Sequence, residues 1–158
     1  MNAVEVRDLV KSYGSFEAVS GLTFDVREGE IFALVGPNGV GKSTSLKTIA
    51  TILTPTSGSV TVFGLDTVRD AHSVREIISY LPEEAGAYKN LTGRDYLDFM
   101  ALVFLRDKKK AEAAVAFGSE LSGLKDRLKD KVKTYSKGMT RKLLLARAVM
   151  IRPKLAIL

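Results

Sequence analysis

Residues 31–50 read IFALVGPNGVGKSTSLKTIA, and this stretch decides the fold. The apolar run 31–35 predicts a buried strand, and the sequence after residue 43 predicts a helix, with a glycine-rich loop between them. The loop, GPNGVGKS at 36–43, matches G-x-x-x-x-G-K-[ST], the pattern of a phosphate-binding loop. A strand, such a loop and a helix in that order predict an α/β core that binds nucleotide phosphates.

The residue types of the loop suit this chemistry. Gly36, Gly39 and Gly41 let the backbone turn and approach closely, so that several N–H groups can converge on phosphate oxygens. Lys42 supplies a positive charge for the β- and γ-phosphates, and Ser43 offers a hydroxyl to Mg²⁺. The following helix directs its positive end at the anion. We therefore expect the nucleotide to contact Gly36, Pro37, Asn38, Gly39, Val40, Gly41, Lys42, Ser43 and Thr44.

The segments around this stretch are rich in strand signals. Alternating or apolar sequence at 4–10, 22–26 and 59–64 predicts three strands, and glycines mark the turns between or after them. The final residues, LAIL at 155–158, read as the start of another strand. The first third of the chain is therefore expected to be mainly β structure.

From Thr92 onward the pattern becomes helical. TGRD has the form of a capping box, because an acidic residue follows Thr92 by three positions, and apolar residues then recur at helical spacing to about Leu105. A second helical stretch covers 111–118. A third begins near Ser136 and is stopped by Pro153. The composition changes near residue 90, which indicates two subdomains within one domain.

Composition excludes several classes of function. The 158 residues contain no cysteine, which excludes disulfides, thiolate metal sites and thiol catalysis. The net charge of +6 favours anionic partners. However, positively and negatively charged residues are interleaved in KDRLKDKVK at 125–133, as on a solvated helix face. The charge pattern therefore does not favour a nucleic-acid partner. His72, the single histidine, is expected at the surface. The guanine-reading N-K-x-D and switch D-x-x-G strings of GTPases do not occur.

Four motifs, in this order along the chain, resemble those of the nucleotide-binding domain of the ATP-binding-cassette (ABC) ATPases. YGSFEA at 13–18 resembles the A-loop, and GPNGVGKS is the Walker A loop. YLPEE at 80–84 resembles the Q-loop, and YSKGM at 135–139 resembles the signature that usually reads LSGGQ. The resemblance covers essentially the whole chain and is strongest to the exporter-type bacterial or archaeal branch.

The resemblance implies roles for residues outside the Walker A loop. Tyr13 would stack on the adenine of ATP, although it also suits an ordinary aromatic residue at a strand end. Glu83 stands where glutamine is usual. It becomes a candidate beside Lys42 for catalysis and beside Ser43 for Mg²⁺, although it also suits a solvated loop residue.

The signature contributes two further candidate residues. Ser136 and Gly138 match the family pattern, and they would contact the γ-phosphate of an ATP held by the opposite subunit. Lys137, Met139 and Lys142 depart from the usual glycine, glutamine and arginine. These departures affect the side-chain contacts of the signature and leave its main-chain contacts unchanged. Ser136 would cap its helix in either case.

The fold implied is a P-loop NTPase (RecA-like) core with an N-terminal antiparallel β-subdomain and a helical subdomain that carries the signature. We divide this single, partial domain into three parts. Residues 1–90 form the β-subdomain and the P-loop part of the core, 91–135 form the helical subdomain, and 136–158 form the signature helix and the start of the Walker B strand.

KLAIL supplies only the apolar part of the Walker B strand, so we expect the C-terminal part of the core to lie beyond residue 158. The family's Walker B aspartate and glutamate and its switch histidine have no counterpart here. We therefore expect ATP hydrolysis from the intact domain, and ATP binding without hydrolysis from these 158 residues.

The function implied is that of the ATP-binding subunit of an ABC transporter, with ATP and Mg²⁺ as cofactors. A second nucleotide-binding domain would complete a head-to-tail dimer. A transmembrane permease subunit would hold the protein at the cytoplasmic face of the membrane. Two alternatives stay open, a soluble ABC ATPase acting on ribosomes or DNA and a nucleotide-binding fragment that does not hydrolyse.

Overall fold

The computed structural model describes residues 1–158, which form two compact units. The first unit comprises residues 1–78 together with Ile157, and the second comprises residues 79–156 together with Leu158. The composition change near residue 90 therefore lies inside the second unit. None of the helices combines the length and the apolar character needed to cross a bilayer.

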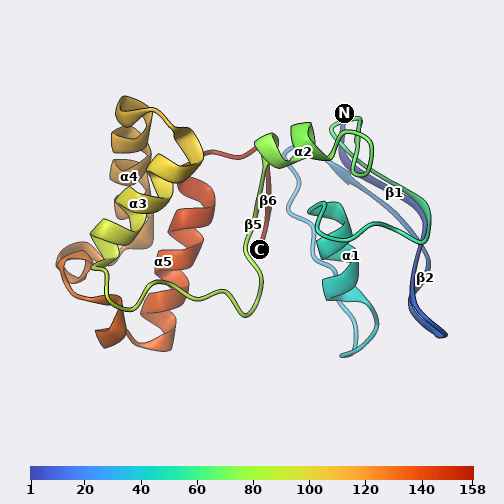
Figure 1. Ribbon diagram of the computed structural model, residues 1–158, viewed down its shortest axis with the longest axis horizontal. Helices are drawn as coiled ribbons and strands as arrows, with labels where there is room; N and C mark the ends of the chain where they lie inside the picture. Colours follow the sequence, from blue (N-terminus) through green and yellow to red (C-terminus); the bar gives the residue numbers. More distant parts are fainter. The chain divides into compact units, whose positions relative to one another are not determined.

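The first unit is built on an antiparallel sheet of four strands, part of which is drawn in blue in Figure 1. The strands are β1 (Asn2–Tyr13), β2 (Phe16–Arg27), β3 (Ser57–Val62) and β4 (Leu65–Asp66), in the order β2-β1-β3-β4. The strands predicted at 4–10, 22–26 and 59–64 fall on β1, β2 and β3, and the N-terminal antiparallel β-subdomain is confirmed. Valines and a leucine on β1 and β3 form its core, namely Val4, Val6, Leu9, Val60 and Val62.

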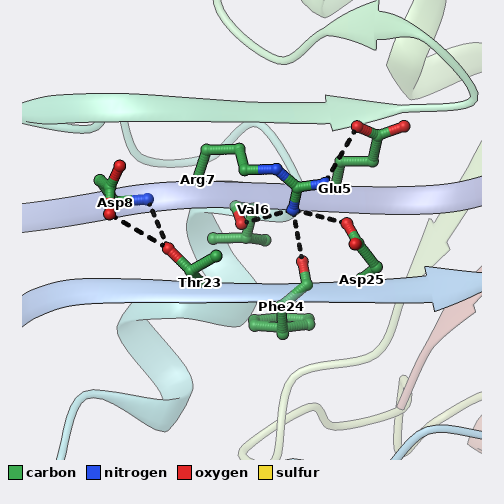
Figure 2. Close-up of polar contacts among 7 residues, drawn as sticks. All are labelled: Glu5, Val6, Arg7, Asp8, Thr23, Phe24 and Asp25. Atoms are coloured by element: carbon green, nitrogen blue, oxygen red, sulfur yellow. Dashed lines mark hydrogen bonds and ion pairs between the residues drawn. The ribbon is translucent and has the colours of Figure 1, made fainter.

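A bulge interrupts the pairing of β1 with β2 at Asp8, whose φ is +46°. The N–H of Asp8 donates a hydrogen bond to the Thr23 hydroxyl at 2.8 Å. Next to the bulge, the guanidinium of Arg7 pairs with the Asp25 carboxylate at 2.6 Å and donates to the Phe24 carbonyl at 3.4 Å (Figure 2). Hydrogen bonding by Asp25 raises the pKa of Arg7. These side chains hold the two strands together where the ladder is interrupted.

The segment 31–35 is not a strand, so that prediction is wrong. It has no regular secondary structure, and neither sheet includes it. An apolar segment becomes a strand only when a neighbour supplies partners for its main-chain groups, and no strand of residues 1–158 pairs with it. Ile31 is fully exposed, whereas the Phe32 ring stacks on Phe24 of β2 with centroids 4.9 Å apart. That stack attaches the segment to the sheet.

Two helices complete the first unit. Helix α1 (Lys42–Ile49) follows the glycine-rich loop as predicted, and its buried face packs near β3 and β2. Helix α2 (Ala71–Ile77) follows a turn organised by Asp66. The Asp66 carboxylate accepts hydrogen bonds from the N–H groups of Arg69 and Val68, both at 2.9 Å, and these bonds lower the pKa of Asp66.

Three helices dominate the second unit: α3 (Gly93–Leu105), α4 (Lys108–Ser122) and α5 (Lys137–Met150) (Figure 1). The predicted start of α3 is confirmed, because the Thr92 hydroxyl accepts the N–H of Asp95 at 3.0 Å. Helix α4 is longer than predicted at both ends. Asp107 caps its first turn by accepting the Lys110 N–H at 3.0 Å, and Gly123, with φ of +62°, ends it.

Between α4 and α5, the segment 125–133 was expected to be a solvated helix face. It forms two short 3₁₀ helices, η1 (Lys125–Lys129) and η2 (Val132–Thr134), each anchored by one buried apolar residue, Leu128 or Val132. Strand β5 (Ile78–Tyr80) pairs with β6 (Leu155–Ile157) in a separate two-stranded sheet. The strand predicted at the end of the sequence is therefore confirmed.

Candidate functional site

The glycine-rich loop has a backbone that side chains would disturb. Gly39 and Gly41 adopt left-handed conformations, with φ of +83° and +89°. A Cβ atom on Gly41 would overlap the Ala18 carbonyl oxygen and lie 2.8 Å from the Val19 side chain. Gly41 is therefore required both by its backbone conformation and by close packing on β2.

Lys42 folds back over the loop that precedes it. Its Nζ atom donates hydrogen bonds to the carbonyl oxygens of Gly36 and Pro37, at 2.7 and 2.6 Å. These bonds hold the ammonium group beside the loop backbone. A positive charge held there is suited to the oxygens of a polyphosphate.

The N-terminus of α1 has no acidic residue and no capping side chain that would compete with an anion for its free N–H groups. Gly41 occupies the N-cap position without a side-chain hydrogen bond, and the first turn has no acidic residue. The hydroxyls of Ser45 and Thr48 donate to carbonyls one turn back, at 2.9 Å each, and both residues are buried. Ser43, in contrast, is exposed and its hydroxyl has no partner within the protein. Ser43 therefore offers an exposed, unpaired hydroxyl at the start of this helix, where it can reach a metal ion.

Tyr13 lies at the end of β1 and is 47% exposed. The Lys11 ammonium lies 5.2 Å from the centre of its ring, and the same Nζ donates to the Thr54 carbonyl at 2.8 Å. The sheet register pairs Lys11 with Val19, which also adjoins Gly41. The structure therefore brings the Tyr13 end of β1 and the glycine-rich loop to the same part of the first unit.

The sequence alone did not single out Lys11. Its position two residues before Tyr13 in one strand is the signal that could have identified it, because residues i and i+2 lie on one face. Stacking of Tyr13 on adenine stays a prediction.

Glu83 belongs to the second unit and lies in an exposed turn, where the Ala85 N–H donates to the Pro82 carbonyl at 3.1 Å. Its carboxylate makes no hydrogen bond or ion pair within the protein. Its proposed role at the metal stays a prediction. His72 is on the surface, as expected: its side chain is 87% exposed and its Nδ1 lies 3.6 Å from the Glu76 carboxylate.

Ser136 and Gly138 also belong to the second unit, at the start of α5. The Ser136 hydroxyl accepts the N–H of Met139 at 3.2 Å, which confirms its expected role as a cap. Both residues are exposed, and a Cβ atom on Gly138 would meet only the Ser136 hydroxyl oxygen, at 4.0 Å. Packing within the unit therefore does not require a glycine here, and the bare backbone is open to a ligand.

Comparison with known proteins matches residues 19–158 to the family described as "ABC transporter". The linearmycin resistance ATP-binding protein LnrL of Bacillus subtilis is 33% identical over 155 residues, which cover 98% of this chain and 50% of that protein. The daunorubicin/doxorubicin resistance ATP-binding protein DrrA of Streptomyces peucetius is 37% identical over 160 residues, covering 99% of this chain and 47% of that protein. The chain thus spans about half the length of these curated relatives.

Two solved structures that resemble this chain are also ATP-binding proteins. The structure of an ATP-binding subunit of an ABC transporter superposes with a TM-score of 0.83 at 29% identity, over 98% of this chain and 64% of that one. A dimeric ATP-binding cassette, solved in a post-hydrolysis state with ADP and Pi, superposes with a TM-score of 0.82 at 22% identity. The superposition covers 97% of this chain and 72% of that one, and it shows that the two share a fold. The P-loop NTPase fold expected from the sequence is confirmed, and the chain belongs to the ABC transporter family of ATP-binding proteins.

Proposed function

We propose that this chain is the ATP-binding part of an ABC transporter and that it binds MgATP at the loop 36–44. The observation that carries the proposal is the position of Lys42, whose ammonium is held on the loop carbonyls of Gly36 and Pro37 beside the uncapped start of α1. Relatives named for drug resistance and for bacitracin transport support the transport setting.

The residues of the loop suit both ATP and Mg²⁺. The left-handed backbone at Gly39 and Gly41 gives the phosphates close access to main-chain N–H groups. Lys42 would neutralise phosphate charge, and the free hydroxyl of Ser43 would hold the metal. Bound Mg²⁺ would supply further charge stabilisation for the phosphates. Tyr13, at the same part of the unit, would cover the adenine ring.

We further propose that two such domains face each other head to tail. The exposed Ser136 and Gly138 of one domain would then meet the ATP held by Lys42 and Ser43 of the other. ATP binding would close the dimer and hydrolysis would open it. The Glu83 turn would pass that motion to a transmembrane permease, which would hold the protein at the cytoplasmic face of the membrane.

Nucleotide binding is tested with a fluorescent ATP analogue and the Lys42→Ala variant. We expect at least a tenfold loss of affinity, because the substitution removes the cation that the loop holds for the phosphates. Lys47→Ala is the matched control, since Lys47 is exposed in the last turn of the same helix and far along it from the loop. Equal affinity of wild type and Lys42→Ala would contradict the proposal.

Hydrolysis is a separate test. We propose that the intact domain hydrolyses ATP and that the 158-residue chain by itself does not, because the carboxylates that follow the Walker B strand in this family have no counterpart in it. Mg²⁺-dependent phosphate release from this chain, abolished by Lys42→Ala, would show that another group replaces them.

A further inference from the structure

Main-chain hydrogen bonds join the start of α3 to residues 130–132, in the segment that leads into α5. The Val132 N–H donates to the Leu91 carbonyl at 2.9 Å, and the Gly93 N–H donates to the Asp130 carbonyl at 3.2 Å. Thr92, the cap of α3, forms an antiparallel bridge with Lys131. The segment that leads into α5 is therefore attached to the residues that begin α3, within one compact unit.

Tyr135, the residue before the Ser136 cap, adds a side-chain contact to this junction. Its hydroxyl donates to the Arg127 carbonyl at 2.7 Å, and its main-chain N–H donates to the Val132 carbonyl at 2.9 Å. Burial raises the pKa of Tyr135, so its hydroxyl stays protonated and remains a donor at neutral pH. Both the main chain and the side chain of this residue are therefore held in place.

Gly93 leaves the space that the Tyr135 hydroxyl occupies. A Cβ atom on Gly93 would overlap that hydroxyl and lie 3.1 Å from the Leu128 side chain. The φ of Gly93 is not in the left-handed region, so packing and not backbone conformation requires the glycine. Gly93 and Tyr135 lie far apart in the sequence, yet the missing side chain of one leaves room for the hydroxyl of the other.

The first turn of α5 follows Tyr135 directly, with Ser136 as its cap. Ser136 and Gly138 are exposed, and the hydrogen-bond partners of Ser136 lie within its own helix. The Met139 N–H donates to the Ser136 hydroxyl, and the Thr140 N–H donates to its carbonyl at 2.9 Å. Nothing beyond the helix holds these residues directly. Tyr135, the residue that enters this turn, is held at the start of α3, and Met139 of the same turn packs against the apolar core of the unit.

We propose that Tyr135 is a positioning residue whose hydroxyl, seated against Gly93, fixes the direction in which α5 presents Ser136 and Gly138. The consequence for nucleotide rests on the proposed function, because the same turn would meet the phosphate of an opposing domain. Loss of the contact leaves the Walker A loop unchanged and impairs only the association of two domains around ATP.

The contact itself is tested by amide hydrogen exchange on the 158-residue chain. We expect Tyr135→Phe to speed exchange of the amides of residues 136–140 about fivefold, as for the loss of one hydrogen bond, and Gly93→Ala to speed it at least as much. Gly86→Ala is the matched control, because a Cβ atom on Gly86 meets nothing within 4 Å. Exchange in β1 and β3 is expected to stay constant in all of these variants.

A double variant separates a specific contact from general damage. Tyr135→Leu removes the hydroxyl that Gly93 accommodates, so Gly93→Ala is expected to add little in that background. An equal effect of Gly93→Ala with and without the tyrosine would overturn the proposed contact. So would faster exchange spread evenly over both units, since that result indicates loss of global stability.

The positioning role is tested by ATP-dependent self-association, measured by sedimentation beside binding of the fluorescent ATP analogue. We expect Gly93→Ala to weaken self-association at least fivefold while analogue affinity stays within twofold of wild type. Self-association that is unchanged in Gly93→Ala, or absent from the wild type with ATP bound, would overturn this role. Unchanged analogue binding in Lys42→Ala would instead overturn the proposed function, and the exchange measurements would still decide the role of Tyr135 within its unit.

Discussion

Gly41→Ala is expected to destabilise the chain much more than Gly39→Ala, although both glycines lie in the same loop. Both have left-handed backbone conformations, with φ of +89° and +83°, which cost an alanine about 1 kcal/mol. Around Gly39 a Cβ atom meets nothing within 4 Å, so no further cost is expected there. At Gly41 the Cβ would overlap the Ala18 carbonyl and lie 2.8 Å from Val19. Moving β2 or the loop to relieve that overlap adds about 2 kcal/mol.

The expected total for Gly41→Ala is therefore about 3 kcal/mol, which corresponds to a fall in Tm of roughly 6–12 °C for a chain of this size. The assay is thermal and urea unfolding of wild type and both variants, followed by circular dichroism under identical conditions. Equal losses in the two variants would refute the reasoning, because they would show that Gly41 does not pack against β2. Nucleotide affinity, measured on the folded variants, should fall in both.

Two further predictions concern local hydrogen bonds. Thr92→Ala removes the acceptor of the Asp95 N–H and should lower stability by about 1 kcal/mol in urea unfolding, whereas Thr92→Ser should retain most of it. The N–H bonds from Arg69 and Val68 lower the pKa of Asp66 below its ordinary value of 3.8, so their contribution is present above about pH 4 and is lost as pH falls through the folded-state pKa. Asp66→Asn should therefore lower the urea midpoint at pH 7 and change it little at pH 2; an equal decrease at both values would contradict this assignment.

Features that depend on neighbouring residues could be predicted from the sequence. The spacing of GPNGVGKS identifies the loop, and helix α1 follows it as expected. Thr92 and Ser136 mark the starts of α3 and α5, because a capping side chain reaches only three residues along the chain. The alternating apolar residues predict β1, β2 and β3 of the first unit, although not the short β4. These signals lie within one turn or one strand, so the sequence displays them directly.

Contacts between distant segments were decided only by the tertiary structure. The apolar segment 31–35 has the sequence pattern of a strand but does not form one. Strand formation depends on a neighbouring strand, which the residues of the segment do not specify. The need for glycine at Gly41 comes from β2, and the need for glycine at Gly93 comes from Tyr135. The sequence by itself determined the pattern of a phosphate-binding loop at 36–43 and the caps at which α3 and α5 begin. Folding decided which side chains meet, since packing depends on atoms brought together from distant positions.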